Sequence, residues 1–232
     1  KHRPAFFCGL EYWIIEPSVR RQMWQKKNLC DFGGQVVWFD SLTALPQEGV
    51  CGVIFSNELL DAMPVHRFGW DAGNQVWFEW GVTIGENAFV WKRMTEKAPE
   101  PGNGDGFAGR PRLPTELSAM LPDGFTTETC PLAENWWRQA ASALRYGKLL
   151  TIDYGLTAEQ LFTPERMAGT LRSYHGHRLK NDVLANAGEQ DITAHVDFTA
   201  LQTAGESLGL TTEWLCSQAQ FVTRIAEQIW NL

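Results

Sequence analysis

Acidic side chains that follow apolar runs are the residues of this sequence best suited to chemistry. Three such runs end in a single acid, namely Glu16, Asp40 and Asp153. In an open parallel sheet, ligands bind beyond the carboxyl ends of the strands, so these carboxylates would share one rim. The two oxygens of Glu16 could accept hydrogen bonds from the vicinal hydroxyls of a ribose, and Asp40 could accept from an adenine amino group. Each acid could equally cap the helix after its strand.

Residues 57–64 (NELLDAMP) follow a fourth apolar run and form the most informative segment. Polar side chains that faced the core there without partners would be costly, so we expect Asn57, Glu58 and Asp61 to line a cleft. A carboxylate can hold a guanidinium through two hydrogen bonds and orient its nitrogen toward an electrophilic methyl group. The alternative is that Asn57 and Asp61 cap a helix that begins at Leu59.

The elements that must position these acids alternate as in a parallel sheet with crossover helices. Strands are predicted at residues 10–16, 35–39, 52–56 and 148–153, and Ser18 is predicted to cap a helix after the first strand. Further helices are predicted at residues 115–120, 133–144, 198–208 and 218–230, with a late strand at residues 211–216. The sequence therefore predicts an α/β domain.

Residues 65–130 interrupt this alternation. Short strands predicted at residues 65–70, 75–80 and 88–93 are joined by turn-forming segments, which indicates an antiparallel insertion. The GxGxxG match at residues 104–109 lies in a Pro/Gly-rich loop with no strand before it, so it does not predict a phosphate site. We expect residues 1–64 and 131–232 to form the core and residues 65–130 to shape a substrate cleft.

Composition excludes several classes of function. The 232 residues carry a net charge of −7, which argues against nucleic acid as a partner because such binding rests on neutralising phosphates. No apolar stretch is long enough to span a membrane. The five scattered cysteines suit a reducing compartment. His175 and His177 could share one face of a strand, but no third ligand has a supporting spacing, so no metal site is predicted.

Four sequence blocks resemble the MidA-like methyltransferases and occur in that family's order. They are YWIIEPSVRRQ, SNELLDAMPVHRF, LLTIDYG and GTLRSYHGHR…GEQDITAHVDFTAL, and they span residues 11–198. The resemblance implies a Rossmann-like class I fold and S-adenosyl-L-methionine as cofactor. Mitochondrial members of the family are linked to arginine dimethylation of a respiratory complex I subunit, which implies a protein partner with an exposed arginine.

The resemblance also implies roles for individual residues. Those implied to contact the cofactor are Glu16, Asp40, Ser41 and Asn57. Those implied to act in catalysis are Glu58, Asp61 and Asn57, with Glu58 as the first choice for holding the acceptor guanidinium. Those implied to form the far, substrate-binding wall of the cleft are Asp153, Tyr154, Arg172 and His195.

One departure from the family concerns the amino end. A class I methyltransferase begins with a strand and a glycine-rich loop that cradles the methionine part of the cofactor. The nine residues KHRPAFFCG before the first predicted strand contain no such loop, so we expect the fold to lack both features. The other motifs are undamaged, which favours an N-terminally incomplete domain over a protein that has lost catalysis.

The sequence thus predicts a protein-arginine methyltransferase, located in the cytoplasm of a bacterium or in the mitochondrial matrix of a eukaryote. Two alternatives stay open. The first is a non-catalytic assembly or binding protein that has kept the fold. The second is a small-molecule methyltransferase, which would have a closed pocket under the insertion rather than an open groove.

Overall fold

The computed structural model describes residues 6, 8–94, 109–176, 178–180 and 182–230. Contacts between residues divide the mixed α/β chain into two compact units, which are described separately. The first unit comprises Lys1–Ile54 and Gln139–Leu149, and the second comprises Phe55–Arg138 and Leu150–Leu232.

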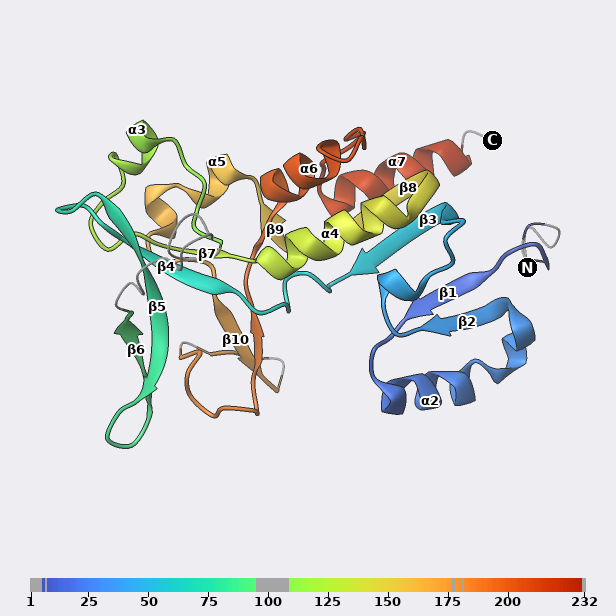
Figure 1. The fold of residues 1–232 in the computed structure, drawn as a ribbon, viewed down its shortest axis with the longest axis horizontal. Coiled ribbons are helices and arrows are strands. Elements are labelled where there is room, and N and C mark those ends of the chain that lie inside the picture. Colours follow the sequence, from blue (N-terminus) through green and yellow to red (C-terminus); the bar gives the residue numbers. More distant parts are fainter. Residues whose placement is uncertain (1–5, 7, 95–108, 177, 181, 231–232) are drawn as a thin grey trace. The chain divides into compact units, whose positions relative to one another are not determined.

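A parallel strand pair and its crossover helix organise the first unit. Strand β1 (Tyr12–Ile15) pairs in parallel with β2 (Val36–Phe39), and helix α2 (Val19–Asn28) connects them alongside (Figure 1). The predicted cap is confirmed, because the Ser18 side chain accepts a hydrogen bond from the backbone N–H of Arg21. The 3-10 segments η1 (Cys30–Gln35) and η2 (Leu42–Ala44) flank β2.

Strands β3 (Val50–Asn57) and β8 (Leu144–Ile152) pair with each other, separately from β1 and β2. The two backbones approach so closely that a Cβ on Gly147 would lie 1.8 Å from the carbonyl oxygen of Gly52, so only glycine fits there. The sequence predicted these strands within a single parallel sheet. In the described residues no ladder joins β1 to β3, and the β3 side chains Val53 and Phe55 are 58% and 51% exposed.

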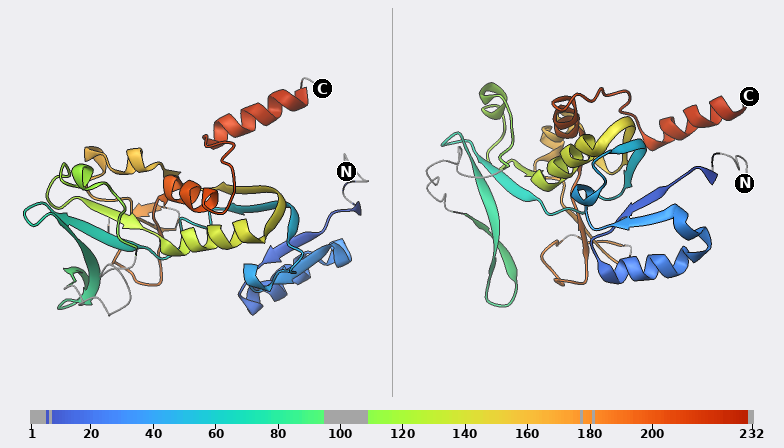
Figure 2. Two further views of the ribbon diagram at one scale, coloured as in Figure 1. Left: turned by 45° about the horizontal axis from the view of Figure 1, so that its top comes forward. Right: turned by 45° about the vertical axis from the view of Figure 1, so that its right-hand side comes forward.

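A four-stranded antiparallel sheet, called here the insertion sheet, confirms the predicted change of topology. Its strands are β4 (His66–Asp71), β5 (Val76–Ile84), β6 (Phe89–Arg93) and β7 (Thr126–Thr129), in the order β6-β5-β4-β7. Figure 2 shows the long β5–β6 hairpin in two further orientations. Helix α3 (Thr115–Ser118) follows, while residues 104–108 of the GxGxxG match lie outside the described residues. Phe68 and Trp70 on β4, Trp77 on β5 and Phe125 just before β7 form the apolar cluster of this sheet.

The rest of the second unit contains another apolar cluster, formed by Leu60, Ala133, Val196 and Leu201. Its helices are α4 (Pro131–Ala143), α5 (Ala158–Leu161), η3 (Pro164–Arg166), α6 (Phe198–Glu206) and α7 (Gln218–Trp230). Its strands are β9 (Gly155–Leu156), β10 (Arg172–His175), β11 (Arg178–Lys180), β12 (Asp191–Thr193) and β13 (Val196–Asp197). Strand β13 pairs in parallel with β9, and the order β11-β10-β12 forms a small antiparallel sheet.

The predicted strand at residues 211–216 is wrong. This segment has no regular structure, and its side chains Trp214 and Leu215 are 52% and 46% exposed. A strand requires a partner ladder, which local sequence preference cannot supply. His175 ends β10 as expected, whereas His177 lies outside the described residues. None of the described helices has the length and apolar character needed to cross a bilayer.

Candidate functional site

The ends of β1 and β2 bring Glu16 and Asp40 together. The parallel register places Ile15 opposite Phe39, and the backbone N–H of Glu16 donates to the carbonyl oxygen of Phe39 over 2.9 Å. Gln22 on α2 joins the two residues, because its side-chain amide donates to the Glu16 carbonyl oxygen at 2.7 Å and to the Asp40 carboxylate at 2.9 Å. Sequence reasoning missed Gln22, since an isolated amide in a helix carries no local signal.

The Glu16 carboxylate is buried and accepts hydrogen bonds from Ser18, just before α2, and from Gln25 within α2. One oxygen accepts from the backbone N–H of Ser18 at 2.9 Å, and the other accepts from the Gln25 side chain at 3.5 Å. The Trp38 indole donates to the same Gln25 over 2.9 Å. Glu16 therefore binds the backbone of Ser18, and Ser18 rather than Glu16 caps α2. A carboxylate oxygen can accept two hydrogen bonds, so these bonds leave capacity for ribose hydroxyls. Asp40 is exposed, and the Ser41 hydroxyl bonds Thr43 at 2.8 Å.

In the second unit, Asp153 at the end of β8 organises the turn after β3. Its carboxylate accepts from the backbone N–H groups of Leu59 at 3.2 Å, Leu60 at 2.9 Å and Tyr154 at 2.9 Å. Glu58 adopts a positive φ of 46°, and its N–H donates to the Ile152 carbonyl oxygen at 2.9 Å. No helix begins at Leu59, so the alternative in which Asn57 and Asp61 cap such a helix is wrong. The segment is a turn held by a carboxylate.

Asp61 completes a group of three acids, called here the acid cluster: Glu58, Asp61 and Asp153. Asp61 is 5% exposed. Burial, followed by the charge of Asp153 and then that of Glu58, raises the pKa of Asp61 to about 6. Like charges held this close favour a cationic ligand, and a carboxyl group with a raised pKa can take up a proton near neutrality. Asn57, the exposed last residue of β3, precedes the cluster directly.

Backbone hydrogen bonds join the proposed substrate wall to the acid cluster. The N–H of Ala194 donates to the Asp61 carbonyl oxygen at 3.0 Å, and the N–H of Val196 donates to that of Tyr154 at 2.9 Å. His195 is held between these two bonds. Arg172 reaches the same region because β10 pairs it with Thr193 on β12. The sequence-predicted residues Asp153, Tyr154, Arg172 and His195 are thus brought together.

Burial, followed by the charges of Arg172 and then Arg166, lowers the pKa of His195. The imidazole is therefore neutral at neutral pH. Its Nδ1 atom is buried and has no hydrogen-bond partner among the described residues. Arg166, on η3, was not singled out in the sequence, because only the folded chain brings it near the histidine.

The two groups of acids belong to different units. Glu16, Asp40 and Ser41 lie in the first unit, and the acid cluster with Asn57, Tyr154, Arg172 and His195 lies in the second. That both groups face one hollow stays a prediction. Within the part of the chain that the structure describes, no group of three His, Cys, Asp or Glu side chains has the arrangement of a metal site.

Sequence comparison identifies a family. A family described as "Putative S-adenosyl-L-methionine-dependent methyltransferase" matches residues 1–216. Two curated relatives are named protein arginine methyltransferase NDUFAF7, mitochondrial, or its homolog. The Caenorhabditis elegans protein is 28% identical over 184 residues, which cover 77% of this chain and 38% of the relative. The Xenopus tropicalis protein is 26% identical over 186 residues, which cover 76% and 36%.

Solved structures from Burkholderia thailandensis are also similar. A COG1565 superfamily protein bound to S-adenosyl-homocysteine has a TM-score of 0.67 and 32% identity, covering 86% of this chain and 48% of that chain. A native structure of a COG1565 protein has a TM-score of 0.66 and 32% identity, covering 86% and 50%. The chain spans about half the length of these structures and less than two fifths of the curated relatives. It therefore belongs to this family of S-adenosylmethionine-dependent methyltransferases, which its sequence blocks identify as MidA-like.

Proposed function

We propose that the protein transfers a methyl group from S-adenosyl-L-methionine to an arginine side chain of a protein. The observation that carries this proposal is the acid cluster at the ends of β3 and β8, in which Asp61 has a pKa of about 6. A negatively charged group of this kind suits a cationic guanidinium better than a neutral acceptor. The printed names of the two curated relatives support the same acceptor.

The cofactor side of the proposed site is built on β1 and β2. Glu16 and Asp40 would accept hydrogen bonds from the ribose hydroxyls and the adenine amino group. Ser41, which follows Asp40 directly, and Asn57, at the end of β3, are the other proposed cofactor contacts. The chemistry of these acceptors fits the cofactor, because Glu16 and Asp40 follow the carboxyl ends of two paired parallel strands. S-adenosylmethionine, when bound, supplies an electrophilic methyl group on a sulfonium.

On the acceptor side, Glu58 would hold the guanidinium, and Asn57 and Asp61 would complete the grip. With the cofactor bound, the guanidinium nitrogen would bond to the methyl carbon, and the bond from that carbon to sulfur would break with its electron pair left on sulfur. The nitrogen then gives up one proton, and Asp61 is suited to receive it, because its pKa is closer to neutrality than that of an ordinary aspartate. Asp153, occupied with three backbone N–H groups, positions the turn that carries the other two acids.

The proposed acceptor is a macromolecule. Residues 65–130, with the segment 169–198, would shape the cleft that receives the protein substrate. A complex I subunit is the proposed substrate, because the curated relatives are mitochondrial proteins by name. The proposed locations are correspondingly the mitochondrial matrix or, in a bacterium, the cytoplasm.

Methyl transfer to protein tests the proposal directly. The purified protein is incubated with methyl-labelled S-adenosylmethionine and complex I subunits, and mass spectrometry locates the label. We expect label on arginine. Label confined to lysine or to a small molecule would overturn the assigned acceptor. A calorimetric titration with S-adenosyl-homocysteine that gives no heat across several temperatures would favour the non-catalytic binding protein instead.

A further inference from the structure

A buried carboxylate outside the acid cluster has no part in the proposed transfer. Glu128 lies on β7 of the insertion sheet, and its side chain is 1% exposed. Burial raises the pKa of Glu128. Burying an acid is costly unless its oxygens are hydrogen-bonded or paired with a cation. The partners of Glu128 therefore indicate why the fold keeps an acid there.

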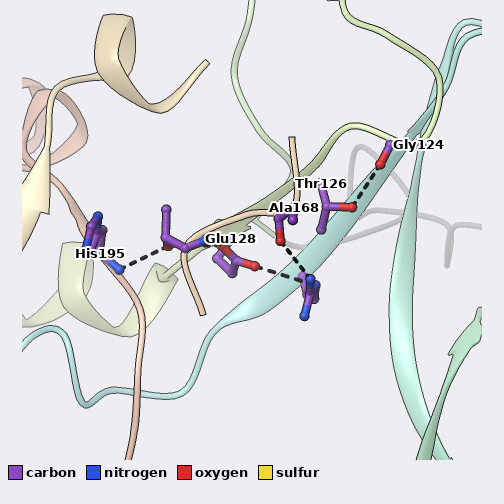
Figure 3. Close-up of polar contacts among 7 residues, drawn as sticks. Gly124, Thr126, Glu128, Ala168 and His195 are labelled. Carbon is purple, nitrogen blue, oxygen red and sulfur yellow. Dashed lines mark hydrogen bonds and ion pairs between the residues drawn. The ribbon is translucent and has the colours of Figure 1, made fainter. Parts of the chain in front are cut away.

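Those partners are on the segment that leads to β10 and on β4. The Glu128 carboxylate accepts from the Thr170 backbone N–H at 2.6 Å and from the Thr170 hydroxyl at 3.0 Å. Arg67 lies 3.5 Å from the other carboxylate oxygen and donates to the Ala168 carbonyl oxygen at 2.9 Å. Figure 3 shows Glu128 and Ala168 joined to this same guanidinium. One acid and one arginine thus hold both ends of a three-residue stretch.

The backbone of this stretch runs beside β7. The N–H of Thr126 donates to the Met167 carbonyl oxygen at 2.9 Å, and Thr126 forms a parallel bridge with Ala168. Gly169 has a φ of +80°, and a Cβ there would lie 2.4 Å from a Glu128 carboxylate oxygen. A residue with a side chain would displace the carboxylate, so the glycine and the acid form a matched pair.

Thr170 also contacts the substrate wall. Its hydroxyl accepts from the backbone N–H of His195 at 3.1 Å (Figure 3). A backbone N–H can only donate and an ionised carboxylate can only accept, so the hydroxyl donates to Glu128 and accepts from His195. Two residues beyond Thr170, Arg172 pairs with Thr193. Besides the two backbone bonds on either side of it, His195 is thus linked to Glu128 through the Thr170 side chain.

We propose that Glu128 is a positioning residue, which holds His195 toward the acceptor through Thr170 and thereby couples the insertion sheet to the substrate wall. The role of His195 at the acceptor rests on the proposed function. His195 is half-buried, and its buried Nδ1 atom has no hydrogen-bond partner among the described residues. Glu128 lies outside the four sequence blocks that resemble the family.

Amide hydrogen exchange tests the link without requiring activity. Thr170→Val removes the hydroxyl and Thr170→Ser keeps it. We expect the exchange of the His195 N–H to accelerate at least about tenfold in the valine variant and to stay near the original rate in the serine variant, because one hydrogen bond is lost or kept. Glu128→Gln should accelerate exchange at Thr170 and His195. Glu79→Gln is the matched control, since Glu79 is in the same sheet and pairs with His66 at 2.6 Å.

Steady-state kinetics tests the consequence for the acceptor. In Glu128→Gln we expect the KM for the protein acceptor to rise about tenfold, while the Kd of S-adenosyl-homocysteine stays within about twofold. A purely structural role would instead accelerate exchange uniformly across the apolar clusters and leave the acceptor KM unchanged, which would overturn the proposal. If the original protein transfers no methyl group, the proposed function fails, and the exchange of the His195 N–H still decides whether Glu128 positions it.

Discussion

Asp153 Oδ2 lies 2.9 Å from the backbone nitrogen of Leu60, across 93 positions of sequence. The end of β8 thereby fixes the turn that follows β3. The carboxylate also accepts from Leu59 and Tyr154, so it does for this turn what a helix cap does for a helix end. The strand-end acid predicted to face substrate therefore acts first on the backbone that carries Glu58 and Asp61.

Removal of this carboxylate should destabilise the fold. Asp153→Ala leaves three backbone N–H groups without their acceptor, and we expect the free energy of unfolding to fall by about 2 kcal/mol. Urea denaturation measures the change. Asp123→Ala is the control, because Asp123 accepts from one exposed backbone N–H, that of Ala72, and its loss should cost less than about 1 kcal/mol. Equal midpoints for the two variants would contradict the role given to Asp153.

Asp61 should make stability depend on pH in a definite direction. Its pKa in the fold is about 6, above its ordinary value of 3.8, so the folded chain retains a proton that the unfolded chain releases between these values. The contribution of Asp61 to stability is thus fully present below about pH 4 and is lost as the pH rises through 6. Asp61→Asn should match the original protein at low pH and be the more stable of the two at pH 8. Urea denaturation across this range checks the prediction, and a variant less stable at pH 8 would contradict it.

Gly169 and Gly188 provide a matched comparison of backbone and side-chain effects. Both have positive φ, +80° and +86°, but a Cβ at Gly188 would meet nothing within 4 Å. An alanine at either position should cost about 1–2 kcal/mol for its backbone conformation. Gly169→Ala should cost at least about 1 kcal/mol more, because its Cβ would press on the Glu128 carboxylate. Thermal unfolding measures the stability lost in each variant. Equal losses of stability in the two variants would show that the Glu128 carboxylate moves away from the new Cβ without cost.

Local signals in the sequence were sufficient for part of the fold. The apolar run before Glu16 and the cap at Ser18 are properties of neighbouring residues, and β1 and α2 form as predicted. Strand β7 was not predicted, because TTET lacks apolar alternation. It forms because β4 pairs with it and the fold buries Thr126 and Thr127. The opposite error at residues 211–216 has the same origin, because β preference without a partner strand gives no strand.

The candidate site likewise contains residues that the sequence reveals and residues that only the structure reveals. Asn57, Glu58, Asp61 and Asp153 stand at strand ends, which the sequence reveals. Gln22, Arg166 and Glu128 act through partners at least six positions away in sequence, and Arg67 is the most distant partner of Glu128. No periodicity or motif marks such long-range pairs. These pairs form only in the folded chain, as when Thr170 comes to lie beside Glu128 on β7.

In the proposed function, Glu58 holds the guanidinium that receives the methyl group. The most direct measurement compares Glu58→Gln with the original protein in transfer of labelled methyl to arginine and in affinity for S-adenosyl-homocysteine. Glu86→Gln, an exposed acid between β5 and β6, serves as the control for the change in charge. We predict a loss of transfer of at least about 100-fold in Glu58→Gln, with cofactor affinity within about twofold. Normal turnover in Glu58→Gln would show that Glu58 does not hold the acceptor guanidinium.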